Sequence, residues 1–225
     1  VFLPGFRSDM QGSKALHLHD ACAARGRAFL RFDYSGHGAS AGQFEDGTIS
    51  AWTDDATTVF DELTTGPQIL VGSSMGGWIA LLLALRRPER VAGLILLAPA
   101  PDFTQALMWP AFTPAQRAAL ERDGVIGLPS QYGEPTPVTR TLIEDGRNNL
   151  LLEKPIPLRC TVRILQGMAD PDVPWRHALR LVDALDSSDV RLHLLKDGDH
   201  RLSRPDDLAL LVGTLDSLTA PPGSP

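Results

Sequence analysis

Cysteine is scarce in this sequence of 225 residues, which contains only Cys22 and Cys160. The two lie far apart in the chain and form no CxxC or Cys/His spacing, so neither a disulfide framework nor a metal site is indicated. We expect both to be reduced thiols in the core of a cytoplasmic protein, because free thiols persist in that compartment.

Long hydrophobic runs and clusters of basic residues are also missing. The longest apolar runs, residues 78–85 and 94–98, are far shorter than the roughly 20 residues that cross a bilayer, so no membrane span is expected. The net charge is −6 and the basic residues are scattered, so nucleic acid is not a predicted partner. There is no glycine-rich phosphate loop, and no cofactor is predicted. The sequence gives no prediction of the oligomeric state.

Short apolar runs alternate with amphipathic stretches of helical length, an order typical of parallel strands joined by crossover helices. The predicted strands are residues 1–3, 27–34, 68–72, 91–98, 161–166 and 190–196. The predicted helices are residues 13–25, 50–63, 75–87, 175–185 and 205–218. No break in composition divides the chain, so we expect one α/β domain over residues 1–225, with a mostly parallel sheet flanked by helices. Because the sequence begins inside a predicted strand, we expect a preceding segment, and a targeting peptide there stays open.

Residues 101–157 interrupt this alternation. They are rich in proline and glycine, carry a helical patch at 113–122, and contain the aromatic residues Phe103, Trp109, Phe112 and Tyr132. An insertion of this length between two core strands is usually functional, so we predict a small lid. The alternative is a surface excursion without a function.

One predicted strand passes through a tight turn into a helix, and the turn carries the pentapeptide Gly-Ser-Ser-Met-Gly at 72–76. This matches G-x-S-x-G, in which a nucleophilic serine sits on a strained turn. The residues two before and two after it must lack side chains so that the backbones can approach. Ser74 meets this requirement, whereas Ser73 would have Val71 and Met75 at those positions. Ser74 is therefore the predicted nucleophile.

Two backbone N–H groups are predicted to form the oxyanion hole. Ser74 lies at a helix N-terminus, where free N–H groups and the helix dipole favour a negative charge, so the Met75 N–H is the first donor. The second donor is expected from the loop after the first strand, Pro4-Gly5-Phe6, and the Phe6 N–H is the candidate.

The general base is predicted to be His200. Where a serine lies on such a turn, the triad follows the chain order Ser, then Asp or Glu, then His, which leaves His177, His193 and His200. His177 falls within a predicted helix and His193 lies in the middle of a strand. His200 follows the last strand in a polar loop, from which an imidazole can reach Ser74.

Asp170 is the predicted acid, because it comes just after the strand at 161–166. Its role would be to accept a hydrogen bond from Nδ1–H of the histidine, to fix the tautomer and to stabilise the imidazolium. Asp172 and Asp102 stay as alternatives, although an aspartate beside a proline is more commonly a turn or helix-start residue.

Several segments together resemble the α/β-hydrolases: residues 72–78, residues 87–91, Gln166-Gly167-Met168 with Asp170, Val173-Pro174-Trp175, and Asp199-His200-Arg201. The resemblance is strongest to the branch that contains a mitochondrial palmitoyl-protein thioesterase which is also an acyl-glucuronide esterase. It covers nearly the whole chain. It implies the α/β-hydrolase fold and the hydrolysis of acyl esters or thioesters, with Ser74, Asp170 and His200 as the triad.

The predicted function is therefore that of a serine hydrolase acting through an acyl-enzyme on a small-molecule ester or thioester. The aromatic residues of the predicted lid indicate a hydrophobic acyl group. The alternatives are a protein of this fold that binds a ligand without cleaving it, and a lactonase or carbon–carbon bond hydrolase with the same triad. The complete triad argues against the binding protein.

Overall fold

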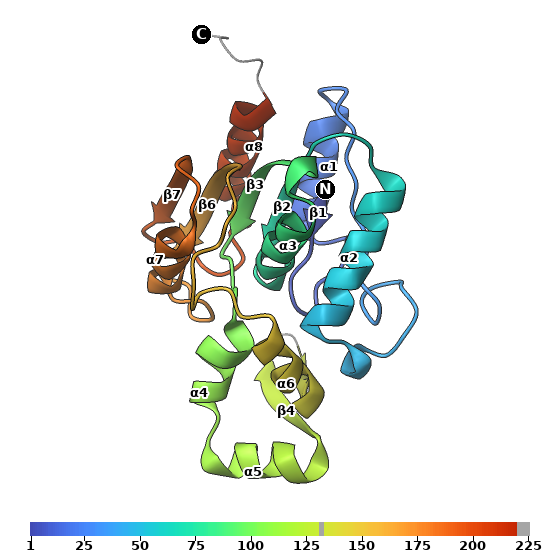
Figure 1. The fold of residues 1–225 in the computed structure, drawn as a ribbon, viewed down its shortest axis with the longest axis vertical. Coiled ribbons are helices and arrows are strands. Elements are labelled where there is room, and N and C mark those ends of the chain that lie inside the picture. Colours follow the sequence, from blue (N-terminus) through green and yellow to red (C-terminus); the bar gives the residue numbers. More distant parts are fainter. Residues whose placement is uncertain (131–132, 220–225) are drawn as a thin grey trace.

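A five-stranded parallel sheet forms the centre of the protein, as the computed structural model shows for residues 1–130 and 133–219 (Figure 1). The strand order is β1-β2-β3-β6-β7. The strands span Phe2–Leu3, Gln68–Ser73, Val91–Leu97, Thr161–Gly167 and Val190–Leu195 in that order. Each neighbouring pair is parallel, which confirms the predicted mostly parallel sheet.

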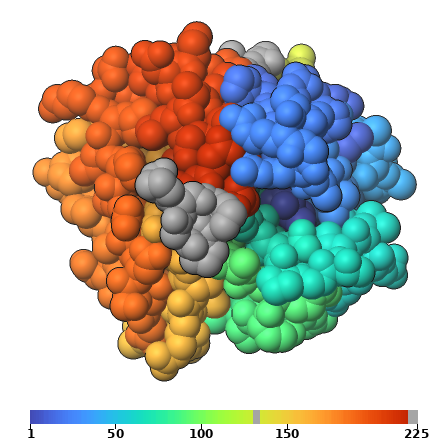
Figure 2. All heavy atoms as spheres, turned by 90° about the horizontal axis from the view of Figure 1, so that it is seen from above, coloured from blue at the N-terminus to red at the C-terminus, as the bar shows by residue number. Residues whose placement is uncertain are grey.

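Helices cover both faces of the sheet. One face carries α1 (Ser13–Ala23) and α8 (Pro205–Thr219). The other face carries α2 (Ile49–Leu63), α3 (Met75–Arg86) and α7 (Trp175–Ala184). Alternate strand residues enter the two cores, so that Leu70 packs with α3 and Val71 packs with α1. Figure 2, seen from the end opposite residues 101–157, shows α8 beside the N-terminal part of the chain.

The amphipathic spacing explains why α2 forms where it does. Ile49, Trp52, Ala56 and Phe60 recur every three or four residues and are buried, so one stripe of the helix faces the core. The helix begins at a good N-cap, since the side chain of Thr48 accepts a hydrogen bond from the Ala51 N–H.

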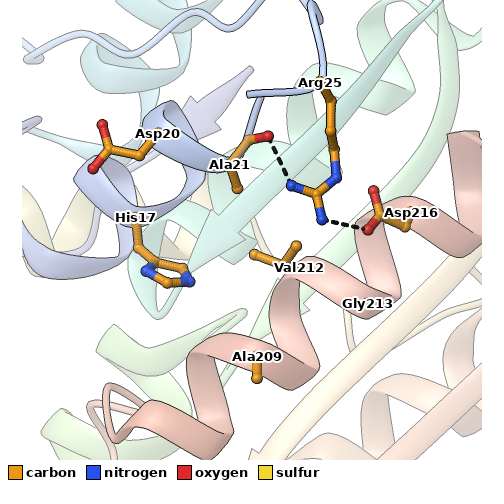
Figure 3. A pocket seen from close by; sticks show the side chains of 8 residues that line it. All are labelled: His17, Asp20, Ala21, Arg25, Ala209, Val212, Gly213 and Asp216. Atoms are coloured by element: carbon orange, nitrogen blue, oxygen red, sulfur yellow. Dashed lines mark hydrogen bonds and ion pairs between the residues drawn. The ribbon is translucent and has the colours of Figure 1, made fainter. Parts of the chain in front are cut away.

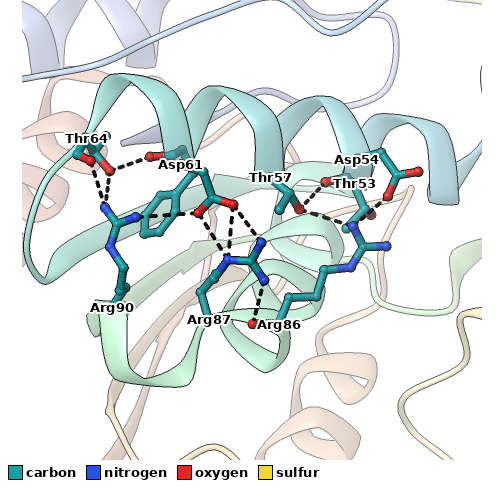
Figure 4. A network of polar contacts seen from close by, with 9 residues as sticks. Thr53, Asp54, Thr57, Asp61, Thr64, Arg86, Arg87 and Arg90 are labelled. Atoms are coloured by element: carbon teal, nitrogen blue, oxygen red, sulfur yellow. Dashed lines mark hydrogen bonds and ion pairs between the residues drawn. The ribbon is translucent and has the colours of Figure 1, made fainter.

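Arginines at the end of α3 and just after it hold α2 in place (Figure 4). Arg86 pairs with Asp54 at 2.6 Å, and Arg87 pairs with Asp61, also at 2.6 Å. The Arg87 guanidinium bonded to Asp61 lowers the pKa of that carboxyl below its usual value. These pairs are largely solvent-exposed, so they orient the two helices and contribute little to stability.

The predicted strand at 27–34 is wrong. Only Arg31 makes a bridge to Phe2, and the Phe2 N–H donates to the Leu30 carbonyl at 2.8 Å. The neighbouring strand β1 has two residues, so there is little ladder for this segment to extend. Asp33 also draws the chain into a loop, because its carboxylate accepts backbone N–H groups from residues 10 and 39.

Residues 101–157, called the insertion below, contain more regular structure than the sequence predicted. The predicted patch at 113–122 is helix α5, which starts with a capping box between Thr113 and Gln116. The elements of the insertion are η3 (Thr104–Met108), α4 (Trp109–Ala111), α5 (Pro114–Asp123), β4 (Val125–Ser130), β5 (Gly133–Thr139) and α6 (Arg140–Asn148). No strand was predicted in this proline-rich segment, but the antiparallel β4–β5 pair forms because each strand of a two-stranded sheet has a free edge that tolerates proline. Tyr132, one of the predicted lid aromatics, lies outside the described residues.

Asp102 joins the two ends of the insertion. Its side chain is buried, and its two carboxylate oxygens accept the N–H groups of Leu151 and Leu152, each at 2.8 Å. Burial raises the pKa of the Asp102 carboxyl. A second tie lies close by, since the Trp78 indole N–H of α3 donates to the Asn149 carbonyl at 3.0 Å. The root of the insertion is therefore bound firmly to the core.

Asp102→Asn is expected to lower the free energy of unfolding by about 1–3 kcal/mol, because an amide presents one oxygen where two buried N–H groups need acceptors. Burial raises the Asp102 pKa above its ordinary value of 3.8, so the folded wild type loses stability as the pH rises from 3.8 through the folded value. The variant lacks that dependence. Urea unfolding of both proteins across acidic pH measures each effect. If the wild type and Asp102→Asn give the same free energy of unfolding at every pH, Asp102 does not hold the two ends of the insertion together.

Candidate active site

Ser74 lies on a strained turn between β2 and α3. Its backbone angles are φ 55° and ψ −118°, a region that non-glycine residues rarely adopt. The two glycines of the motif are needed for steric reasons. A Cβ on Gly72 would collide with the Gly76 carbonyl, and a Cβ on Gly76 would collide with the Leu3 carbonyl at the end of β1. The turn therefore has the shape that the pentapeptide predicted.

The three predicted triad residues form one chain of hydrogen bonds. The Ser74 Oγ lies 3.0 Å from Nε2 of His200, and Nδ1 of the same ring lies 2.8 Å from Oδ2 of Asp170. With the ring neutral and protonated on Nδ1, Asp170 accepts from Nδ1–H and Nε2 accepts from the serine hydroxyl. The Asp170 carboxylate is fully buried, whereas His200 is partly open to solvent. A proton can therefore pass from Ser74 to an imidazole held by a buried negative charge.

Backbone contacts hold the loops after β6 and β7 together. The Ala169 N–H donates to the Gly198 carbonyl at 3.0 Å, and the Met168 N–H donates to the Leu195 carbonyl at 2.8 Å. Lys14 of α1 supports the histidine loop from outside by donating to the Arg201 carbonyl at 2.5 Å. These bonds set the separation between Asp170 and His200.

The Asp170 carboxylate is held by other donors besides the histidine. Its Oδ1 accepts the N–H groups of Asp172 and Val173, both at 2.8 Å. Its Oδ2 also accepts a bond of 3.1 Å from Nε2 of Gln166, a buried residue of β6. The contact between Gln166 and Asp170 was not predicted from the sequence. A polar residue inside an otherwise apolar strand was the feature that could have indicated it.

The alternative acids occupy other places. Asp102 lies at the root of the insertion and uses both oxygens there. Asp172 is exposed and donates its backbone N–H to Asp170. Of the three candidates, Asp170 alone is hydrogen-bonded to His200 in the described part of the chain.

The alternative bases are also apart from Ser74. His177 is buried in α7, and its Nε2 lies 2.7 Å from the Pro101 carbonyl, while burial lowers the pKa of its imidazole. His193 is exposed on the edge strand β7 and pairs in register with Leu165 of β6. Among the histidines that the structure describes, only His200 is hydrogen-bonded to the Ser74 side chain.

One group of side chains in the described ranges could hold a cation: ligand atoms of Asp170, Asp172 and His200 lie within 4.8 Å of one another. Two of the three already belong to the hydrogen-bonded chain. Both nitrogens of His200 are used, one toward Asp170 and one toward Ser74. The arrangement therefore suits proton transfer better than metal binding.

The loop that was predicted to supply an oxyanion donor lies against the turn. A Cβ on Gly5 would sit 3.3 Å from both the Ser73 carbonyl and the Ser74 side chain, so the glycine permits this close approach. Met75 is the first residue of α3, and its N–H belongs to the unpaired first turn of that helix. The candidate donors Phe6 and Met75 therefore flank Ser74 from two elements.

Aromatic side chains connect this loop to the insertion. The Phe6 ring packs against Phe44 at 4.9 Å and against Phe103 at 5.8 Å between centroids. Phe103 in turn packs edge-on against Trp78 of α3 at 5.6 Å. Of the three predicted lid aromatics in the described residues, Phe103 contacts the loop beside Ser74, while Trp109 and Phe112 pack on each other.

A hollow of about 460 Å³ between α1 and α8 is a separate feature (Figure 3). Its lining includes His17, Arg25 and Asp216, and Arg25 is already paired with Asp216 at 2.9 Å. It shares no residue with the chain formed by Ser74, His200 and Asp170.

Both cysteines are free thiols, and they differ in burial. Cys22 is a buried free thiol, whereas Cys160 is a half-buried free thiol that packs against the core. Across residues 1–130 and 133–219, no helix is long and apolar enough to cross a membrane.

Comparison with known proteins assigns the class. Residues 1–133 match the family described as Serine aminopeptidase, S33. A protein from Agrobacterium vitis S4 has the same fold, with a TM-score of 0.95 and 49% identity over 97% of this chain and 87% of that one. The chain belongs to the α/β-hydrolase family of serine hydrolases and is a hydrolase.

Within this family, the chain is similar to a mitochondrial thioesterase over nearly its whole length. Human palmitoyl-protein thioesterase ABHD10, mitochondrial, is 41% identical over 220 residues, 97% of this chain and 72% of the relative. The structure of mouse α/β-hydrolase domain-containing protein 10 gives a TM-score of 0.89 at 40% identity over 96% of this chain and 87% of that one. These relatives confirm the resemblance that the sequence motifs indicated. They are named as mitochondrial proteins, so a cytoplasmic location for this chain stays a prediction.

Replacing each acid by its amide is expected to separate the two neighbouring aspartates. Asp170→Asn should lower kcat/KM for an activated ester by about 10,000-fold, because an amide holds the histidine in the wrong tautomer. Asp172→Asn is the matched control and should stay within about threefold, since its backbone N–H still reaches Asp170. Ester hydrolysis by the purified variants measures both values. Equal losses in the two variants would contradict the assignment.

Proposed function

We propose that this protein cleaves carboxylic ester or thioester bonds of hydrophobic acyl substrates through a Ser74, His200 and Asp170 triad and an acyl-enzyme intermediate. The observation that carries the proposal is the continuous chain of hydrogen bonds from Asp170 through His200 to Ser74, and Ser74 lies on the strained turn. Family membership supports hydrolysis as the reaction.

In this mechanism Ser74 attacks the acyl carbonyl while its hydroxyl proton moves to Nε2 of His200. The negative charge on Oδ2 of Asp170 stabilises the imidazolium, 2.8 Å from Nδ1. The N–H groups of Phe6 and Met75 bind the oxyanion. His200 returns the proton to the leaving alkoxide or thiolate, which departs and leaves Ser74 acylated. Water then attacks the acyl-enzyme, with His200 again as base, and releases the acid and free Ser74.

The proposed preference for a hydrophobic acyl group rests on two observations. The rings of Phe6, Phe103 and Trp78 form a continuous apolar wall at the loop beside the turn, in which the Phe6 ring is partly exposed and the other two rings are buried behind it. The curated relatives that match nearly the whole chain are named palmitoyl-protein thioesterases, whose acyl group is a long alkyl chain. Residues of the insertion contribute to this wall, which supports the proposal that the insertion acts as a lid.

The family assignment and the intact chain of hydrogen bonds favour an enzyme over the binding protein that the sequence left open. Lactonases and carbon–carbon bond hydrolases share this triad. No contact in the described residues favours either of them, so the ester or thioester hydrolase is the function we propose.

A fluorophosphonate probe is expected to label the wild type at Ser74 with one probe per chain, because only an activated serine reacts. Labelling should vanish in Ser74→Ala and persist in Ser73→Ala, the matched control one residue away. Mass spectrometry of the modified peptide identifies the site. A folded wild type that stays unlabelled, or a probe found on another residue, would overturn the proposed nucleophile.

A longer acyl chain is expected to give a higher kcat/KM for p-nitrophenyl esters. Burying even two additional methylenes against the aromatic wall contributes about 1.6 kcal/mol, or roughly 10-fold. The octanoyl ester should therefore exceed the acetyl ester by at least about 10-fold, and the matching thioesters should follow the same order. Equal values for the acetyl and octanoyl compounds would count against a hydrophobic acyl site.

A further inference from the structure

Gln166 is a fully buried amide in the middle of the proposed machinery, yet it touches no reacting atom. It lies in β6, one residue before the end of the strand. Its Nε2 is 3.1 Å from each of three acceptors: Oδ2 of Asp170, the Val173 carbonyl and the Gly167 carbonyl. One side-chain amide therefore joins the strand end, the acid and the start of α7.

The chemistry of these neighbours fixes which way the amide points. All three atoms near Nε2 are oxygens that accept hydrogen bonds, and two of them are backbone carbonyls. A flipped amide would place its own oxygen against three oxygens, with no proton between any of them. Gln166 therefore donates toward Asp170.

The other end of the amide is unsatisfied. Oε1 of Gln166 is buried and finds no hydrogen-bond partner among the described residues. An unpaired buried carbonyl costs about 1–3 kcal/mol, and an apolar side chain of similar shape would avoid that cost. The two bonds to backbone carbonyls contribute to folding despite that cost, and the third bond places a donor on the acid.

We propose that Gln166 is a positioning residue for the catalytic acid, an inference that rests on the proposed triad. The Asp172 and Val173 N–H groups fix one carboxylate oxygen, and Gln166 together with His200 fixes the other. The carboxylate plane then cannot rotate away from Nδ1 of His200. Loss of the Gln166 donor leaves Oδ2 held by the histidine alone, so the imidazole loses its fixed orientation toward Ser74.

Gln166→Met is the direct test, because methionine keeps the length of the side chain and removes both the donor and the unpaired oxygen. We expect a loss of about 10-fold or more in kcat/KM and in the rate of fluorophosphonate labelling of the folded protein, together with a lower melting temperature, because the Gly167 and Val173 carbonyls also lose a donor. A merely structural role predicts the lower melting temperature with normal activity and labelling in the folded fraction. That pattern would overturn the proposal.

Tyr34→Phe is the matched control. The Tyr34 hydroxyl is also buried without a partner among the described residues, and it lies outside the triad and the oxyanion loop. Its removal should leave kcat/KM within about twofold, since it takes away an unpaired oxygen and no contact with Asp170. If Tyr34→Phe lowers activity as much as Gln166→Met, the effect is not specific to the acid and the proposal fails.

A double-mutant cycle with Asp170→Asn tests whether Gln166 acts through Asp170. In the Asp170→Asn background, Gln166→Met should change kcat/KM by less than about twofold, because the carboxylate that it positions is gone. An undiminished further loss would show that Gln166 acts elsewhere. Gln166→Leu is the second variant if methionine prevents folding, and failure of both to fold would make Gln166 a folding residue and overturn the proposal.

The outcomes separate this inference from the proposed function. An inactive, unlabelled wild type would overturn the triad itself. If the wild type is active and Ser74→Ala abolishes labelling, the triad stays in place. A fully active Gln166→Met would then overturn the role of Gln166 alone.

Discussion

The steric fit at the turn between β2 and α3 is the constraint on which the rest of the structure depends. The turn requires three backbones to approach within contact distance, and only Gly72 and Gly76 allow it. The same approach places the end of β1 against α3, so it also sets where the loop of Gly5 and Phe6 lies. Ser74 accepts an unfavourable backbone conformation because its surroundings leave no other.

The parallel sheet then brings together residues that are distant in the sequence. Ser74, Asp170 and His200 follow β2, β6 and β7, and the carboxyl ends of parallel strands meet at one edge. The loops carrying the acid and the histidine are joined through the Gly198 carbonyl, which accepts the Ala169 N–H. Geometry at the site is therefore fixed mainly by backbone hydrogen bonds and by the register of the strands.

The insertion combines a fixed root with an apolar contact to the site. Asp102 holds the two ends of the segment together, and Phe103, the next residue, reaches the Phe6 ring. A carboxyl group and an aromatic ring one position apart thus perform different tasks, one anchoring the segment and the other packing against the Phe6 ring. Farther out, Arg7 donates to the Pro135 carbonyl of β5 at 3.2 Å and links the loop of Gly5 and Phe6 to the β4–β5 pair.

The sequence by itself determined those features that depend on neighbours along the chain. Glycines two residues on either side distinguish Ser74 from Ser73, and the hydrophobic period of α2 follows from Ile49 to Phe60. The alternation of apolar runs and amphipathic stretches was enough to predict the parallel sheet and most of its helices. The position of His200 after the last strand was likewise a local signal.

Only the tertiary structure decided among residues with similar local signals. Asp102 and Asp170 both follow strands, but the first accepts N–H groups about 50 residues away and the second faces a histidine 30 residues away. The segment 27–34 has the composition of a strand, yet a two-residue neighbour gives it too little to pair with. The bond from Gln166 to Asp170 depends on how the chain turns after β6. The physical reason is the same throughout: local propensity depends on adjacent residues, whereas the partner of a polar group depends on which distant segments pack against it.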